Sequence, residues 1–191
     1  MKTISTLLLC LASFLTLCSC STTNSSSMIP ASDTRLADLT CRYNSCGQPR
    51  SNYESRVPSH IATHEKTIIV DPNVHTWAAY DPDGSLVKAG LATAGGKWCP
   101  DIHRPCKTSS GSFRISSLGG PDCKSTRYPL GKGGAPMAFC MFFHNNYSLH
   151  ASSEVLEGNV SHGCVRLHYS DAQWIRYNFA DVGTRVIVKP Y

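Results

Sequence analysis

Residues 61–93 read IATHEKTIIVDPNVHTWAAYDPDGSLVKAGLAT and contain three stretches rich in β-branched and aromatic residues. The stretches are residues 61–70, 74–80 and 86–93, and the turn sequence DPDG at 81–84 separates the last two. Because β-branched and aromatic residues favour strands and Asp-Pro-Asp-Gly favours a turn, the sequence predicts a β-hairpin preceded by another strand.

Three further short strands are predicted outward from this region, separated by Gly and Pro: residues 112–116 (SFRIS), 138–143 (AFCMFF) and 184–189 (TRVIVK). Residues 170–180 (SDAQWIRYNFA) are the only helix we expect, because apolar residues recur there at helical spacing and Ser170 can cap the first turn. The fold class predicted from the residues is therefore mainly β, with one short helix near the C-terminus.

Composition and charge limit the classes of function. The chain has 191 residues, of which 41% are hydrophobic and 16% charged, so it can bury one domain core and carry a tail. Its net charge is +5, which falls to +4 if Lys2 is removed with a targeting segment. Basic residues are scattered without any run of Lys or Arg, and we therefore expect no nucleic-acid partner.

The N-terminus has the pattern of an export signal. Lys2 precedes an apolar stretch of eleven residues at 7–17, which is too short to span a hydrocarbon core of about 30 Å as a helix. The stretch ends in LCSC at 17–20, which resembles a bacterial lipobox and predicts lipidation of Cys20 after removal of residues 1–19. An ordinary secretory signal is the alternative. A lipid anchor at Cys20 would hold the protein on the periplasmic side of the cell envelope, and Ser21 resembles the second residue of lipoproteins sent to the outer membrane.

Residues 20–59 are rich in Ser, Thr, Asn, Pro and Arg and show no sustained periodicity, so we expect a flexible tether there. Cys41 and Cys46 lie within it, with four residues between them, and are predicted to form a local disulfide. The globular domain is expected over residues 60–191.

The chain has ten cysteines, which favours an oxidising compartment. Loss of Cys10 and Cys18 with the signal and lipidation of Cys20 leave seven. Neighbours in sequence suggest the pairs Cys41–Cys46, Cys99–Cys106 and Cys123–Cys140, with Cys164 unpaired, although six cysteines allow 15 pairings and the sequence does not choose among them.

A zinc site is the competing interpretation of Cys99, His103 and Cys106. These residues lack the short spacing of structural zinc sites, and no second Cys/His pair is available. We therefore expect disulfides there, no metal and no cofactor.

Cys164 lies in the string SHGCVRL at 161–167, and His150 precedes it by fourteen residues. A cysteine thiol has a pKa near 8.5, and a nearby imidazole and guanidinium would favour the thiolate. Gly163 would let a substrate carbonyl or the backbone approach closely. These features suit acyl transfer, although a Cys/His pair alone is more often structural.

The complete pattern is more specific. His150-Ala151 followed by SHGCVRL resembles the signature of L,D-transpeptidases of the YkuD/ErfK type, although the family usually has Gly where this chain has Ala151. Residues 108–115 (TSSGSFRI) resemble the family's T-P-x-G-x-F segment, with Ser109 in place of Pro, and residues 183–186 (GTRV) resemble its closing strand. The resemblance covers about residues 64–190.

This resemblance implies a β-sandwich-like catalytic domain, with disulfide-stapled loops as additions, that acts in peptidoglycan synthesis and cell shape. Cys164 would attack the carbonyl before the terminal D-Ala of a tetrapeptide stem and form a thioester. An amine from another stem or from a lipoprotein Lys would then accept the acyl group, or water would hydrolyse it. The implied partners are peptidoglycan stem peptides.

The resemblance also assigns roles to individual residues. His150 would be the general acid/base, and His162 would orient or stabilise the site. Arg166 would bind a substrate carboxylate or stabilise the thiolate. Ser161 and Gly163 would line the oxyanion region.

Two other interpretations compete with this one. The first is a non-catalytic lipoprotein that uses the same fold to bind peptidoglycan or a host or envelope partner, and the intact Cys164 and His150 count against it. The second is a papain-like peptidase, which the order of His before Cys argues against.

Overall fold

The computed structural model describes residues 52–128, 131 and 133–191. The signal segment at 1–19, the lipidation at Cys20 and the Cys41–Cys46 disulfide lie outside the described residues and stay predictions. No helix within the described ranges is long and apolar enough to cross a membrane.

The predicted hairpin is confirmed. Strands β2 (Thr76–Tyr80) and β3 (Leu86–Thr93) pair antiparallel, and the Gly84 N–H donates to the Asp81 carbonyl to close the turn between them. The strand before them, β1 (Thr67–Asp71), begins six residues later than predicted. The preceding residues use their polar groups locally, since the Thr63 hydroxyl donates to the Glu65 carbonyl instead of leaving the backbone to a strand.

The nine strands of the described residues form one curled sheet of order β4-β9-β1-β2-β3-β8-β7-β6-β5. Neighbouring strands are antiparallel except β1 with β9 and β7 with β8, which are parallel. The sequence reading missed β5, β7 and β8. The strands not yet given are β4 (Gly111–Arg114), β5 (Ser117–Leu118), β6 (Met141–His144), β7 (Tyr147–Ala151), β8 (Val165–Leu167) and β9 (Arg185–Val188).

The two edges of the sheet approach each other, which gives the β-sandwich-like form expected. The segment that joins β4 to β5 bonds near both edges of the sheet. The Ile115 N–H donates to the Thr184 carbonyl, just before β9, at 2.9 Å, and the Ser116 N–H donates to the Phe142 carbonyl on β6 at 2.7 Å. The rings of Phe113 on β4 and Phe143 on β6 lie 5.6 Å apart. The apolar face of the curled sheet is therefore closed around one core.

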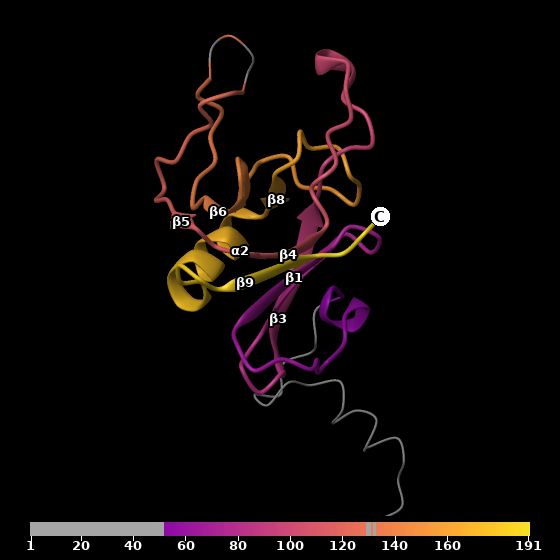
Figure 1. Cartoon of the computed structure of the whole chain (residues 1–191), viewed down its shortest axis with the longest axis vertical. Coiled ribbons are helices and arrows are strands. Elements are labelled where there is room, and N and C mark those ends of the chain that lie inside the picture. The colour runs from indigo at the N-terminus through magenta and orange to yellow at the C-terminus, as the bar shows by residue number, and fades with distance from the viewer. Residues whose placement is uncertain (1–51, 129–130, 132) are drawn as a thin grey trace, which may run out of the picture.

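Within the part of the chain that the structure describes, a single α-helix covers this core, as predicted. It is α2 (Tyr169–Trp174), continued by the π-helical turn η3 (Ile175–Phe179) (Figure 1). The expected N-cap, Ser170, is wrong: the N-cap is His168, whose carbonyl accepts the first helical bonds. Apolar residues at helical spacing are buried as predicted: Ala172, Ile175 and Phe179.

Two long loops extend from the same end of the sheet in Figure 1. One contains the 3-10 turn η2 (Pro100–Ile102) and is closed by the Cys99–Cys106 disulfide. The other follows β5 and is closed by the Cys123–Cys140 disulfide. These are two of the three pairings suggested by neighbourhood in sequence.

The last residues of the expected tether contact the domain. They include the 3-10 turn η1 (Glu54–Arg56), and Arg56 forms an ion pair with Glu157 at 2.7 Å. The Tyr80 hydroxyl on β2 donates to the Pro58 carbonyl at 3.0 Å. Residues 52–59 therefore pack on the sheet, while the domain boundary itself stays a prediction.

Leu149 tests the closed core, because it is fully buried on β7 while Leu156 is 45% exposed. We expect Leu149→Ala to lower the free energy of unfolding by about 2–5 kcal/mol, since it leaves a cavity. The matched control, Leu156→Ala, should lower it by less than about 1 kcal/mol. Urea denaturation measures both, and equal losses would contradict this core.

Candidate functional site

The parallel pairing of β7 with β8 builds the site. Its register places His150 beside Arg166 and Leu149 beside Val165. Because side chains alternate along a strand, His150 and Arg166 share one face of the sheet while Leu149 and Val165 point into the core. Cys164, one residue before β8, continues the same face.

That face forms the wall of a cavity of about 700 Å³. The sequence-predicted residues that line it are Ser161, His162, Cys164, His150 and Arg166. The structure therefore brings together five of the six predicted catalytic or supporting residues in one cavity wall. The sixth, Gly163, supports the cavity from the turn before Cys164.

Cys164 is the only cysteine in the described part of the chain that is not in a disulfide. Its thiol donates to the Asn146 carbonyl at 3.6 Å, and its sulfur accepts a bond from the Ser148 hydroxyl at 3.7 Å. Neither Asn146 nor Ser148 was singled out from the sequence. The polar/apolar alternation of residues 147–151 (YSLHA) could have indicated the strand that places Ser148 here.

The expected direction of the thiol pKa is wrong. Burial raises the pKa of Cys164, and the hydrogen bonds from Ser148 and the charge of Arg166 only oppose this. The charge of Arg166 lowers the pKa of the thiol, as the sequence suggested, but the loss of hydration raises this pKa by more. The thiol of Cys164 is therefore neutral at pH 7, and it would need a base in order to act as a nucleophile.

His150 has the properties of such a base. It is buried, and burial lowers its pKa to about 4, so that the imidazole is neutral at pH 7. Its Nδ1 lies 2.8 Å from the Ala151 carbonyl. Because a carbonyl only accepts, Nδ1 carries the proton and Nε2 has the free lone pair. Ala151 supplies this carbonyl although the family usually has Gly there.

The turn before Cys164 requires Gly163. This residue has φ +122°, and a Cβ added to it would lie 2.2 Å from Cε1 of Tyr147. The Ser161 hydroxyl donates to the Cys164 carbonyl and accepts the Gly163 N–H at 3.1 Å. Ser161 and Gly163 thus hold the turn, and their expected part in the oxyanion region stays a prediction.

Thr108 fixes the same turn from another part of the chain. Its buried hydroxyl accepts the Gly95 N–H at 2.9 Å and donates to the Gly163 carbonyl at 2.8 Å. The Tyr191 hydroxyl in turn accepts the Thr108 N–H and donates to the Gly95 carbonyl, both at 2.8 Å. Sequence reasoning included Thr108 in a motif but gave it no role.

His162 is held by the two stapled loops. Its Nε2 lies 2.7 Å from Oδ2 of Asp101, and its ring lies 4.8 Å from the ring of Tyr128. The bond to His162 lowers the pKa of Asp101, which keeps that carboxylate ionised. These contacts fit the orienting role predicted for His162.

Arg166 forms an ion pair with Glu154 at 2.9 Å, so the group expected to bind a substrate carboxylate already has an acidic partner.

Two residues at the first disulfide-closed loop do not line the cavity: Trp98, which is 54% exposed, and His103. The zinc interpretation of Cys99, His103 and Cys106 is excluded, because the two cysteines are bonded to each other.

Comparisons with known proteins bear on the family and the fold. Residues 65–188 match the family model of the YkuD L,D-transpeptidase catalytic domain. No curated protein matches the chain.

Solved structures share the fold. An L,D-transpeptidase from Xylanimonas cellulosilytica is 23% identical with a TM-score of 0.60, over 69% of this chain and 64% of that one. One from Stackebrandtia nassauensis is 24% identical with a TM-score of 0.54, over 68% and 57%. L,D-transpeptidase 3 from Mycobacterium tuberculosis is 21% identical with a TM-score of 0.52, over 65% and 61%. This chain therefore spans less than two thirds of the length of these proteins.

Thr108→Val tests how the turn is held. The substitution keeps the volume but leaves the Gly95 N–H and the Gly163 carbonyl without a buried partner, so we expect a loss of about 1–3 kcal/mol in unfolding free energy. Local opening should also make alkylation of Cys164 faster, as followed by peptide mass spectrometry. Ser110→Ala, which removes an exposed hydroxyl, is the control and should change neither quantity. Unchanged stability of Thr108→Val would exclude this role.

Proposed function

The chain belongs to the YkuD family of L,D-transpeptidase catalytic domains, and we propose that it transfers the acyl group of a peptidoglycan stem peptide through Cys164. One observation carries the proposal. The thiol of Cys164, directly before β8, and the neutral imidazole of His150, on the parallel strand β7, line one cavity. A thiol that is protonated at rest and a base with a free Nε2 are the two groups that nucleophilic acyl transfer needs.

The first half-reaction releases D-Ala. His150 Nε2 takes the thiol proton as the sulfur of Cys164 attacks the carbonyl that precedes the terminal D-Ala of a tetrapeptide stem. The C–N bond then breaks, and the imidazolium returns its proton to the departing amine. The product is a thioester between the stem and Cys164.

The second half-reaction transfers the stem. An amine attacks the thioester carbonyl, His150 accepts the amine proton, and the C–S bond breaks to restore the thiol. The amine comes from the diamino acid of another stem, which makes a cross-link, or from a lipoprotein Lys, which attaches that protein to the wall. Water is the wasteful acceptor.

The proposed setting is the cell envelope. The predicted export signal at 1–19 and the lipobox-like sequence that ends at Cys20 support a location on the periplasmic side, with a tether to the membrane. Disulfides such as Cys99–Cys106 are consistent with an oxidising compartment.

Cys164→Ala tests the nucleophile. Incubated with a tetrapeptide stem, the wild-type protein should gain the mass of the stem minus D-Ala and release D-Ala, whereas the alanine variant should do neither. Its thermal midpoint should stay within about 3 °C of wild type, since the thiol makes only weak bonds. Intact-protein mass spectrometry measures the adduct. An adduct on the variant would refute the mechanism, and no adduct on wild type would favour the binding-only lipoprotein.

The pH dependence of acylation tests the base. Above the pKa of His150, about 4, the imidazole is neutral and can accept the thiol proton, and below it the protonated ring cannot. We therefore expect kcat/KM for acylation to fall on the acid side with a midpoint near pH 4, well below the ordinary histidine value of about 6.5. His162→Gln is the control and should leave this midpoint in place. A midpoint near 6.5 that disappears in His162→Gln would assign the base to His162 instead.

A further inference from the structure

A second cavity, of about 600 Å³, adjoins the one that contains the thiol. Five residues line both cavities: Arg104, Arg127, Asn146, Tyr147 and His162. The two spaces therefore communicate beside Cys164, whose thiol donates to the Asn146 carbonyl.

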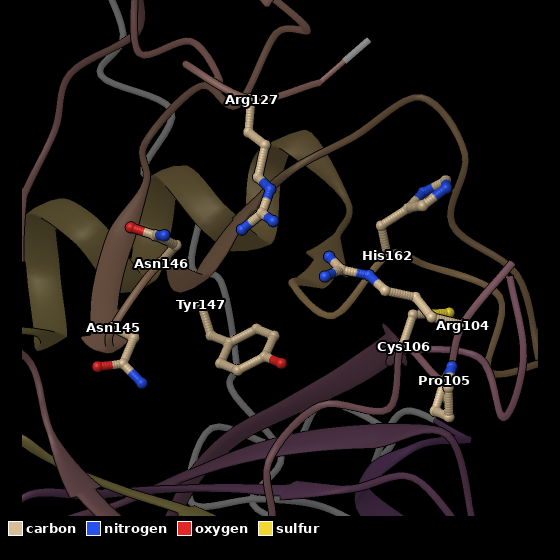
Figure 2. Close-up of a pocket in the computed structure, with 8 residues that line it drawn as sticks. All are labelled: Arg104, Pro105, Cys106, Arg127, Asn145, Asn146, Tyr147 and His162. Carbon is tan, nitrogen blue, oxygen red and sulfur yellow. The ribbon is translucent and has the colours of Figure 1, made fainter. Parts of the chain in front are cut away.

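The second cavity is positively charged. Figure 2 shows the guanidinium groups of Arg104 and Arg127 turned into it from two sides. No acidic residue is found among the described residues that line it. Within the described ranges, neither arginine forms an ion pair, although other charged groups nearby do: Asp101 with His162, and Glu154 with Arg166.

The backbone holds Arg104 in place. It lies inside the loop closed by the Cys99–Cys106 disulfide, and its carbonyl accepts the Cys99 N–H at 3.0 Å. Its guanidinium donates to the Tyr128 hydroxyl at 3.2 Å, which joins this loop to the other stapled loop.

Arg127 is fixed from that second loop. The Ser125 hydroxyl accepts the backbone N–H groups of Arg127 and Tyr128 at 3.1 and 2.8 Å, which forms a local turn. The Ser125 N–H also donates to Ala135 at 2.9 Å, and the Cys123–Cys140 disulfide closes the segment. The backbone at both arginines, and the guanidinium of Arg104, are thus held before any ligand binds, which lowers the entropy cost of binding.

We propose that Arg104 and Arg127 form a carboxylate-binding subsite that selects stem peptides whose diamino acid carries a free side-chain carboxylate over stems in which it is amidated. Guanidinium groups bind carboxylates through paired, charge-assisted hydrogen bonds, which a neutral amide cannot reproduce. The proposal rests on the proposed function: where the thiol attacks the carbonyl of a stem peptide, a carboxylate on that peptide is the anion that can reach the arginines beside Cys164. Arg166, the residue that the sequence suggested for this task, is occupied by Glu154.

The test compares two synthetic tetrapeptide stems that differ only in this group, one with a free carboxylate on the diamino acid and one with its amide. Binding is measured by calorimetry on the full chain carrying Cys164→Ala, so that no chemistry intervenes. We expect the acid to bind about 10–100 times more tightly than the amide. Adding Arg104→Gln and Arg127→Gln should abolish this preference by weakening the acid alone.

Lys97→Ala is the matched control. Lys97 is an exposed cation that lines neither cavity, so its removal should leave the acid preference unchanged. A double arginine variant that keeps the preference, or that weakens both stems equally, would overturn the subsite. Equal loss of preference in Lys97→Ala would also overturn it, because the effect would then be one of overall charge.

Acylation of the wild-type protein by the acid stem, read by mass spectrometry, separates the two proposals. An acid preference that depends on the arginines, found without any thioester, would retain the subsite and reject the transferase function. A thioester formed equally well by both stems in wild type and in the double arginine variant would retain the function and reject the subsite.

Discussion

The parallel register between β7 and β8 is the constraint on which the site depends. It sets His150 beside Arg166 and leaves Cys164 beside Ser148, although sixteen residues separate the members of each pair in the chain. The opposite faces of the two strands are buried in the core, so a slip of one residue would bury the polar groups and expose the apolar ones. The packing of the core therefore fixes which side chains face the cavity.

Burial shifts the pKa values of Cys164 and His150 in opposite directions. It raises the pKa of the Cys164 thiol and lowers that of the His150 imidazole, so both are neutral at pH 7. A buried thiolate–imidazolium pair would have to repay the desolvation of two ions, and the cation whose charge acts on the thiol, Arg166, is already paired with Glu154. In the proposed reaction the thiol proton would move only when the substrate carbonyl arrives, and the Ala151 carbonyl keeps the imidazole in the tautomer that can receive it.

The sequence predicted the parts of this molecule that depend on local pattern. The hairpin around residues 81–84 and the apolar spacing of the helix are local, and so is the thiol left over by pairing neighbouring cysteines. Strands β7 and β8 were not predicted, because each is short and contains polar residues, among them His150 and Arg166, that face the cavity. The direction in which the pKa of Cys164 shifts could not be predicted either. The sequence shows which charged residues are near Cys164, but not how deeply the thiol is buried, and burial has the larger effect. The bonds from Thr108 to Gly95 and Gly163 join residues up to 55 apart, and no spacing rule indicates them.

The two disulfide-closed loops are also held in place by contacts within the folded protein. Loops of this length would lose much conformational entropy if they ordered only when a ligand arrived. The disulfides and the bond between Arg104 and Tyr128 bring that ordering into the folded state, so the positions of the cations beside the thiol are settled together with the core. The same contacts hold His162 between Asp101 and Tyr128. The two disulfide-closed loops are therefore part of the site's construction and set the charges around Cys164.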